Sequence, residues 1–153
     1  MKVTLDLHPE MIIPSLAALT KDEVLAELAV HAAEHANGLD RAEIIKSLLE
    51  REKLGSTGIG DGIAIPHGKL RTIDDIVLAF GRSIAGVDFN ALDERKVHLF
   101  FLLLAPESAA GIHLKTLARI SRIMKDPAVR KGLLEAADSA AIHAIIREQD
   151  SRY

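Results

Sequence analysis

Cysteine is absent from the 153-residue chain. The lack of thiols excludes a cysteine nucleophile, disulfide bonds and cysteine-ligated zinc. Tryptophan is also absent and aromatic residues make up only 3% of the chain, which argues against a surface that stacks nucleic-acid bases. Nineteen basic residues nearly balance 22 acidic ones, and the net charge is −3. Because proteins that bind nucleic acids or anionic membranes are usually strongly basic, we expect neither as a partner.

Long hydrophobic runs are missing as well. The longest near-continuous apolar segment, residues 97–105, is interrupted by His98 and is much shorter than the roughly 20 residues that a membrane-spanning helix needs. The first ten residues, MKVTLDLHPE, lack the apolar region of a secretory signal. We therefore expect a cytoplasmic protein without membrane insertion. Its length, with 48% hydrophobic and 27% charged residues, favours a single domain over residues 1–153.

Capping signals and apolar periodicity predict helices in both halves of the chain and strands between them. Helices are expected after Thr20, whose spacing to Glu23 is that of a capping box, after Asp40, and after Asp126. The remaining helices are expected at residues 109–125 and 139–149, and strands at 11–14, within 55–70, at 73–80 and at 97–105. In the 109–125 helix we expect these side chains to face inward: Leu114, Leu117, Ile120, Ile123 and Met124. This order predicts an α/β protein whose sheet is covered on both faces.

The Gly-rich segment at residues 55–70, GSTGIGDGIAIPHGKL, does not match the common phosphate or nucleophile motifs. It lacks the final spacing of the dinucleotide fingerprint, and no helix follows it. Five residues rather than four separate Gly62 from Gly68, so it is not a P-loop. Leu54 occupies the first glycine position of a nucleophile elbow around Ser56. Nucleotide binding and serine hydrolysis therefore lose their main support.

One histidine in this segment is a candidate nucleophile. Pro66 favours an extended backbone before His67, and Gly68 permits a sharp exit, so we expect the imidazole at the end of a short strand. Histidine is partly unprotonated at neutral pH and can act as a nucleophile, although a turn histidine without a role fits the same pattern. Arg51 and His113 could join it. The alternatives are a cation at a helix C-terminus for Arg51 and a hydrogen-bonded core residue for His113.

Two other patterns have a structural explanation. The motif from His31 to His35 reads H-x-x-E-H, a spacing found in some zinc proteases, but no further ligand is evident and we expect no metal site. Basic side chains on one side of the 109–125 helix are expected to form a solvated face, and the alternative is a docking surface for an acidic partner. They are Lys115, Arg119, Arg122 and Lys125.

Residues 51–69, REKLGSTGIGDGIAIPHGK, closely resemble the active-site signature of IIA domains (EIIA) of the bacterial phosphotransferase system, PTS. The resemblance is to the fructose–mannitol class, type 2, and most of all to its nitrogen-regulatory branch. His113-Leu114 with Leu117-Ala118 resembles the second motif of the family. The resemblance implies one EIIA type-2 domain over residues 1–153, folded as a three-layer α/β/α sandwich with a mixed β-sheet.

The resemblance also implies a phosphotransferase chemistry without a cofactor. His67 would accept a phosphoryl group from the histidine phosphocarrier HPr or its nitrogen-branch relative. The resemblance implies that His67 reacts through Nε2. Arg51 and His113 would flank it. Since phosphoryl transfer depends mainly on positioning and on stabilising negative charge, the guanidinium and the imidazole suit these roles. Further phosphate contacts are expected from Ser56, Thr57 and Gly68.

The missing cysteine bears on the branch of the system. Sugar-transporting relatives are often fused to a IIB domain that accepts the phosphoryl group on a cysteine. This chain contains no cysteine. The resemblance therefore favours a regulator whose phosphorylation state controls binding to a target protein. Three alternatives stay open. They are a sugar-branch IIA that serves a separate IIB protein, a binding module whose His67 is never phosphorylated, and a small hydrolase that uses His67 with Asp61.

Overall fold

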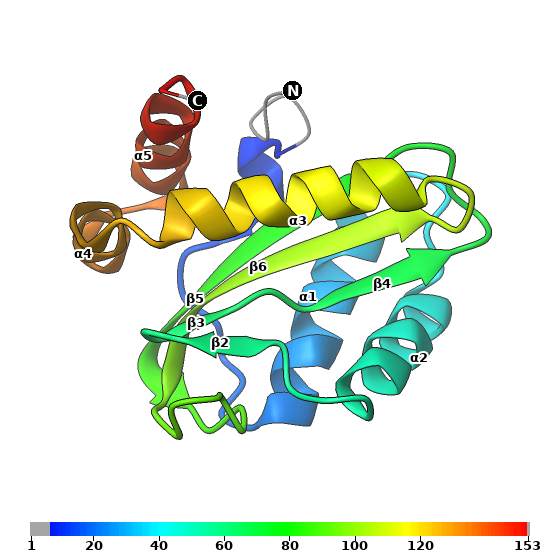
Figure 1. The fold of residues 1–153 in the computed structure, drawn as a ribbon, viewed down its shortest axis with the longest axis horizontal. Helices are drawn as coiled ribbons and strands as arrows, with labels where there is room; N and C mark the ends of the chain where they lie inside the picture. The colour runs from blue at the N-terminus through cyan, green and yellow to red at the C-terminus, as the bar shows by residue number, and fades with distance from the viewer. Residues whose placement is uncertain (1–6, 153) are drawn as a thin grey trace.

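A mixed six-stranded sheet forms the centre of the computed structural model, which describes residues 7–152 (Figure 1). The strand order is β1-β5-β6-β3-β2, and β4 also pairs with β6. β6 is antiparallel to β5 and parallel to both β3 and β4. The strands are β1 (Ile12–Ile13), β2 (Gly58–Gly60), β3 (Ile63–Ala64), β4 (His67–Leu70), β5 (Val77–Val87) and β6 (Val97–Pro106).

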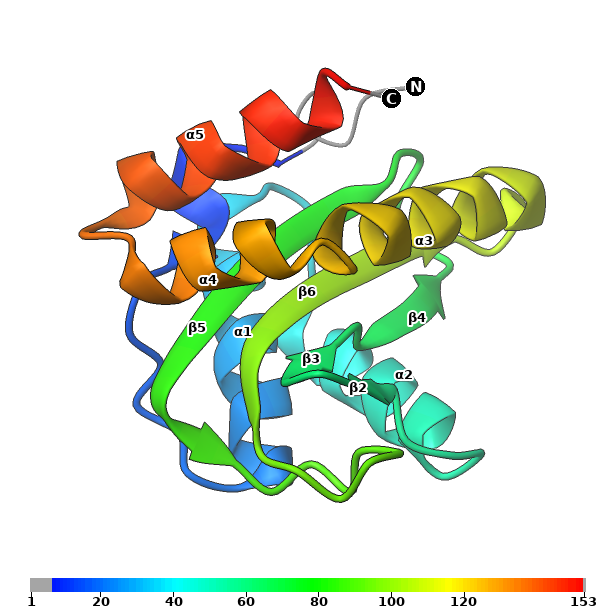
Figure 2. The ribbon, with the colours of Figure 1, turned by 60° about the vertical axis from the view of Figure 1, so that its left-hand side comes forward.

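Helices cover both faces of this sheet. α1 and α2 lie on one face, whereas α3 crosses the other face and leads into α4 and α5 (Figures 1 and 2). The expected three-layer α/β/α sandwich with a mixed sheet is thus confirmed. The helices are α1 (Lys21–His35), α2 (Arg41–Glu52), α3 (Ala110–Met124), α4 (Pro127–Glu135) and α5 (Ser139–Asp150), and a 3-10 turn, η2 (Pro9–Met11), precedes β1.

The predicted helix starts are confirmed by their caps. Thr20 and Glu23 form the capping box at the start of α1, with the Thr20 side chain accepting from the Glu23 backbone and the Glu23 side chain from the Thr20 backbone. Asp40 accepts a hydrogen bond from Ala42 N at the start of α2, and Asp126 caps α4 in the same way. These signals are local in sequence, so the chain alone was sufficient to predict them.

The predicted strand at residues 73–80 has the wrong bounds. β5 begins at Val77 and continues to Val87, because it pairs antiparallel with β6 over this length. Arg82 lies in the middle of the strand and is 5% exposed. Its guanidinium donates to the carbonyls of Pro14, Leu133 and Ala136 at 2.6–2.9 Å, which compensates for the burial of the charge.

The inward face of α3 differs from the prediction at one position. Leu114 is 65% exposed, so its predicted inward orientation is wrong. His113 faces inward instead, and successive residues of a helix are rotated by about 100°, so the next residue turns toward solvent. Ile120, Ile123 and Met124 are buried as predicted, and Leu117 packs against the core.

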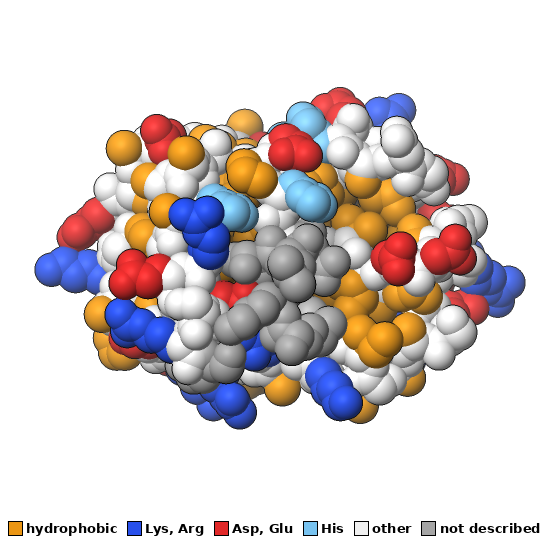
Figure 3. All heavy atoms as spheres, turned by 90° about the horizontal axis from the view of Figure 1, so that it is seen from above, with side chains coloured by type: hydrophobic (Ala, Val, Ile, Leu, Met, Phe, Trp, Pro, Cys, Tyr) orange, Lys and Arg blue, Asp and Glu red, His pale blue; other side chains and the backbone are white. Residues whose placement is uncertain are grey.

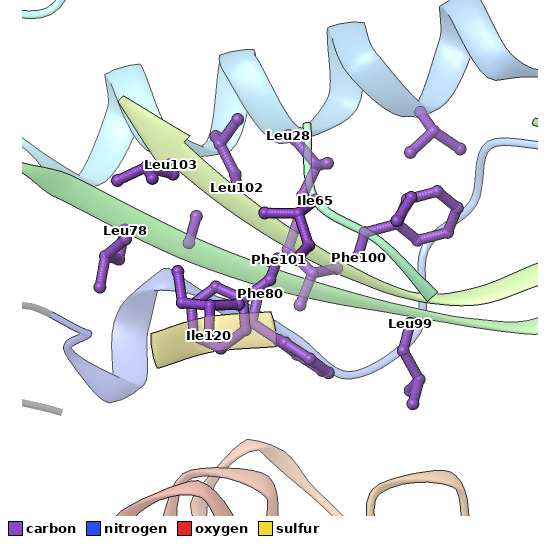
Figure 4. Packing of buried hydrophobic residues seen from close by; sticks show 14 of the residues in the cluster. Leu28, Ile65, Leu78, Phe80, Leu99, Phe100, Phe101, Leu102, Leu103 and Ile120 are labelled. Carbon is purple, nitrogen blue, oxygen red and sulfur yellow. The ribbon is translucent and has the colours of Figure 1, made fainter. Parts of the chain in front are cut away.

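The core lies on both sides of the two central strands. Phe80 and Phe101 meet edge to face on the side of α3, where Ile120 covers them, with ring centroids 5.7 Å apart (Figure 4). Phe100 and Leu102 point to the opposite side, toward α1 (Figure 4). Because both faces are covered, the side chains of β6 from Leu99 onward are buried without the alternation typical of a one-sided sheet.

The surface carries charges of both signs. On the face in Figure 3, acidic and basic side chains are interspersed, with hydrophobic ones between them. Within residues 7–152, no helix has the length and hydrophobicity that crossing a membrane requires. The expectation that the N-terminus carries no secretory signal concerns residues 1–6 in part, and these lie outside the described residues.

Candidate functional site

The backbone around His67 follows from the proline before it. β3 and β4 pair with β6 in the same register, with Ile63 opposite Leu99 and His67 opposite Leu103. Pro66 lies between the two strands and has no N–H to give to the ladder, so regular pairing stops for two residues. His67 therefore begins β4, whereas the sequence placed it at the end of a strand.

Two hydrogen bonds define the tautomer of His67. Nδ1 lies 2.8 Å from the carbonyl oxygen of Ile65, to which it donates, and Nε2 lies 3.2 Å from Nε of Arg51. A guanidinium only donates, so Nε2 carries the lone pair. Burial lowers the pKa of His67 below its ordinary value, the bond to Ile65 opposes this, and the charge of Arg51 lowers it further. The imidazole is therefore mainly neutral at pH 7, with the lone pair on Nε2.

Arg51 is held from two sides. It stands in the last turn of α2, where a cation suits the helix dipole. Its Nη1 donates to the carbonyl of Gly55 at 2.8 Å while its Nε donates to His67. Gly55 has φ +141°, so the turn that presents this carbonyl favours glycine. The guanidinium is thus oriented toward Nε2 of His67 before any ligand arrives.

His113 approaches the same imidazole from α3. It lies in the first turn of that helix, and its ring centroid is 5.3 Å from that of His67 at an interplanar angle of 73°. The residue is 6% exposed, and its Nδ1 has no hydrogen-bond partner within the part of the chain that the structure describes. Burial lowers the pKa of His113, and repulsion from Lys69 and from His67 in its protonated form lowers it further. A buried ring nitrogen without a partner can bind a group that enters the site.

A cavity of about 410 Å³ opens over His67. Its lining contains two cations and two carboxylates together with an exposed leucine, and it consists of Ser47, Glu50, Arg51, Leu54, His67, Gly68, Lys69, Glu107 and His113. The structure thus brings Arg51, His67, Gly68 and His113 together, as the resemblance implied. The cavity is large enough for a phosphoryl group and an approaching side chain.

Gly68 lets β4 pack closely on α2. A Cβ at this position would lie 2.3 Å from Oγ of Ser47 and 3.1 Å from its Cβ. Ser47 Oγ in turn donates to the carbonyl of Lys69 at 3.1 Å. Since Ser47 precedes Arg51 by one helical turn, this contact sets the distance between Arg51 and His67.

Ser56 and Thr57 lie outside the cavity, in the loop before β2. The Ser56 hydroxyl donates to the carbonyl of Phe89 at 2.8 Å, and the Thr57 hydroxyl donates to the carboxylate of Glu52. The phosphate contacts expected of both residues stay predictions, and their hydroxyls already have partners. Asp61 lies in the turn between β2 and β3, where its N–H donates to Asp93, so the structure does not bring it to His67 as the hydrolase alternative needs.

The sequence analysis missed several residues of the site. Ser47 could have been found because it stands four residues before Arg51 and shares its helix face. Lys69 lies two residues after His67 in the same strand, so both side chains lie on the same side of the sheet. Glu107 follows the end of β6 and has no local signal, because only the pairing of β4 with β6 brings it near.

The other patterns do not form a second centre. His31 binds the carbonyl of Glu10 and His35 that of His31, and the two rings stack at 4.1 Å. Within the described range, no three or more side chains of the metal-binding types are grouped to hold an ion. On α3, Arg119 binds the buried carboxylate of Asp150 in α5 at 2.5 Å, so the basic side of this helix is partly internal.

Residues 7–149 match the family described as phosphoenolpyruvate-dependent sugar phosphotransferase system, EIIA 2. The nitrogen regulatory protein of Bradyrhizobium diazoefficiens is 44% identical over 146 residues, which cover 95% of each chain. The fructose-specific EIIABC component of Bacillus subtilis is 38% identical over 98% of this chain, but the match covers only 24% of that protein.

Solved structures agree with these relatives. Nitrogen regulatory protein IIA-Ntr from Neisseria meningitidis superposes with a TM-score of 0.88 at 31% identity, over 94% of this chain and 98% of that one. IIA mannitol from Escherichia coli has a TM-score of 0.77 at 20% identity over 91% and 97% of the two chains, and shares the fold. The extent of these matches, over a fold with the expected layers, shows that the chain belongs to the EIIA type-2 family of the phosphotransferase system.

Proposed function

We propose that this chain is a single EIIA domain that accepts a phosphoryl group on Nε2 of His67 from an HPr-type carrier in the cytoplasm. The observation that carries the proposal is the pair of hydrogen bonds on His67. Ile65 holds the proton on Nδ1, and Arg51 faces the lone pair on Nε2. An unprotonated ring nitrogen beside a fixed guanidinium is what attack on a phosphoryl group requires.

The transfer exchanges one phosphorus–nitrogen bond for another. The lone pair of His67 Nε2 attacks the phosphorus, and the bond to the carrier's histidine breaks with its electron pair returning to that nitrogen. His67 keeps its proton on Nδ1, and the carbonyl of Ile65 stabilises the positive charge that the ring gains. No metal or cofactor takes part in this scheme.

Cationic and imidazole groups of the cavity would stabilise the phosphoryl oxygens. Once Nε2 is bonded to phosphorus, the N–H groups of the Arg51 guanidinium donate to the phosphoryl oxygens. Lys69 adds a second positive charge at the cavity wall. The imidazole of His113, which also lines the cavity, supplies a third polar group. Because the product must pass its phosphoryl group on or lose it, these groups favour the transition state over the stored product.

Regulation through the phosphorylation state follows from the surroundings of the cavity. Leu54 is 84% exposed at its wall, and Ile112 and Leu114 beside His113 are 49% and 65% exposed. Such apolar groups offer contact area to a partner protein. A phosphoryl group adds about −1.5 to −2 charges next to that surface and would weaken or create binding. The relatives named nitrogen regulatory proteins favour a regulatory target as this partner.

The second candidate is a sugar-branch IIA that passes the group to a separate IIB protein. It is favoured by the match to the fructose-specific EIIABC component along nearly the whole chain. Incubating the protein, phosphorylated with a labelled phosphoryl group, with a fructose-type IIB protein would distinguish the two functions. Rapid transfer of the labelled phosphoryl group to IIB indicates the sugar branch, whereas its retention on this protein indicates the regulator.

Incubation with phosphoenolpyruvate, enzyme I and either the general or the nitrogen-branch carrier tests the proposal itself. We expect one acid-labile phosphoryl group per chain. If neither carrier phosphorylates the protein, the proposal fails and the binding module without phosphorylation replaces it.

A further inference from the structure

We propose that Glu52 is a positioning residue, which acts through Thr57 and Ile65 to hold His67 in the tautomer with an unprotonated Nε2. This inference rests on the proposed function for its effect on rate. It concerns a side chain outside the cavity that neither contacts His67 nor faces the entering phosphoryl group.

Glu52 is the last residue of α2 and its side chain is only 6% exposed. One carboxylate oxygen accepts from the backbone N–H of Thr57 at 3.0 Å and lies 2.8 Å from Nζ of Lys21. The other oxygen accepts from the hydroxyl of Thr57. Lys21 also lies over the ring of Phe89, 4.6 Å from its centroid. The buried charge is thus compensated, and both donors of Thr57 are tied to the end of α2.

Two further hydrogen bonds connect Thr57 to the reactive ring. The carbonyl of Thr57 accepts from the N–H of Ile65 at 3.0 Å. The carbonyl of Ile65 accepts from Nδ1 of His67 at 2.8 Å. The carboxylate therefore orients Thr57, Thr57 orients the peptide of Ile65, and Ile65 holds the proton on Nδ1.

The neighbour of Glu52 holds the other end of the same loop. Arg51 donates to the carbonyl of Gly55, while Glu52 binds Thr57 two residues later. Two consecutive side chains of α2 thus fasten the loop and reach opposite nitrogens of His67, one directly and one through backbone. The negative charge of Glu52 also raises the pKa of His67, against the effects of burial and Arg51.

Two substitutions separate positioning from charge. Glu52→Gln keeps a carbonyl oxygen for the Thr57 N–H and an amide that can donate to the Thr57 hydroxyl, but it removes the charge. Glu52→Ala removes both contacts with Thr57 and the ion pair with Lys21, and it leaves the two Thr57 donors without partners. Asp126→Ala, which removes the cap of α4 away from the site, serves as a control for lost stability alone.

The experiment measures the rate of phosphorylation by an HPr-type carrier and, in the unphosphorylated protein, the tautomer and pKa of His67 by ¹⁵N NMR. We expect Glu52→Ala to slow transfer by about tenfold or more and to give a mixed tautomer, the scale on which loss of an orienting partner affects a functional histidine. We expect Glu52→Gln to stay within about threefold of the unmodified protein, with the same tautomer and a lower pKa of His67. Asp126→Ala should change neither rate nor tautomer.

An unchanged tautomer in Glu52→Ala would overturn the inference, and so would equal slowing by Ala and Gln, which would assign Glu52 a role through charge alone. If Glu52→Ala does not fold, Thr57→Val removes only the hydroxyl contact, and an unchanged tautomer there would overturn the inference too. If the unmodified protein is not phosphorylated, the proposed function fails, and the NMR comparison still decides whether Glu52 positions His67.

Discussion

Nε of Arg51 lies 3.2 Å from Nε2 of His67 and donates a hydrogen bond to its lone pair. The same lone pair would form the bond to phosphorus. In the unphosphorylated protein this contact holds the ring neutral and in place. When phosphorus bonds to Nε2, the same donors are free to turn to the phosphoryl oxygens. In the proposed reaction, one arginine would thus serve both the resting nucleophile and the charged transition state.

Arg51→Ala should slow phosphorylation of His67 by about 10²- to 10³-fold, the effect expected when one charge-stabilising donor is removed. Arg51→Lys should slow phosphorylation less than Arg51→Ala does. An ammonium keeps the positive charge but lacks the several planar N–H donors of the guanidinium. Rapid-quench measurement of the phosphorylation rate with a saturating carrier checks both. A change below about threefold for Arg51→Ala would exclude this role.

The pH dependence of phosphorylation should reflect a lowered pKa of His67. The neutral ring is the nucleophile, and burial shifts protonation of His67 below its ordinary pKa of about 6.5. The rate should therefore decline on acidification with a midpoint below the ordinary pKa of about 6.5, once the carrier's own titration is subtracted. An NMR titration of His67 in the unphosphorylated protein gives the pKa directly. A midpoint at or above 6.5 would contradict the account of the site.

The same shifts make folding stability depend on pH. His67 and His113 both have a lower pKa in the folded protein than in the unfolded chain. As pH falls below about 6.5 the unfolded chain binds protons first, so the free energy of unfolding decreases there and is unaffected at higher pH. Urea denaturation at pH 7.5 and 5.5 measures this decrease. His67→Gln should lose less stability between these values, and an equal loss would show that His67 does not contribute.

Gly68→Ala should disturb the contact between β4 and α2. Its methyl group would stand 2.3 Å from Ser47 Oγ, so one element must move, at a cost of about 1–3 kcal/mol in unfolding free energy. Phosphorylation should slow because Arg51 and His67 are carried by these two elements. Ser47→Ala removes the clashing oxygen, so the double variant should regain part of the stability. Additive losses in this double-mutant cycle would mean that the clash is not the cause.

What could be predicted from the sequence depended on how local its physical cause was. The caps at Thr20 and Asp40 depend on neighbours within three residues, and both were predicted. The true length of β5 depends on β6, and the burial of Arg82 depends on carbonyls more than 50 residues away, so neither was visible.

In the candidate site, too, the residues that could be predicted are those with a local sequence signal. Arg51, His67 and Gly68 belong to one continuous stretch that carries the family resemblance, and His113 to a second motif. The cavity wall at Glu107 and the hydrogen bonds from Glu52 through Thr57 to Ile65 arise only when the sheet is assembled. The position of the lone pair on Nε2 became evident from the two partners of the His67 ring, which sequence cannot supply.

The central claim is that His67 carries the phosphoryl group, and intact mass tests it most directly. The protein and its His67→Ala variant are incubated with phosphoenolpyruvate, enzyme I and an HPr-type carrier. The mass of each intact protein is then measured by mass spectrometry before and after brief acid treatment. We predict a gain of one acid-labile phosphoryl group in the unmodified protein and none in the variant. A gain that persists in His67→Ala, or that survives acid, would contradict the account.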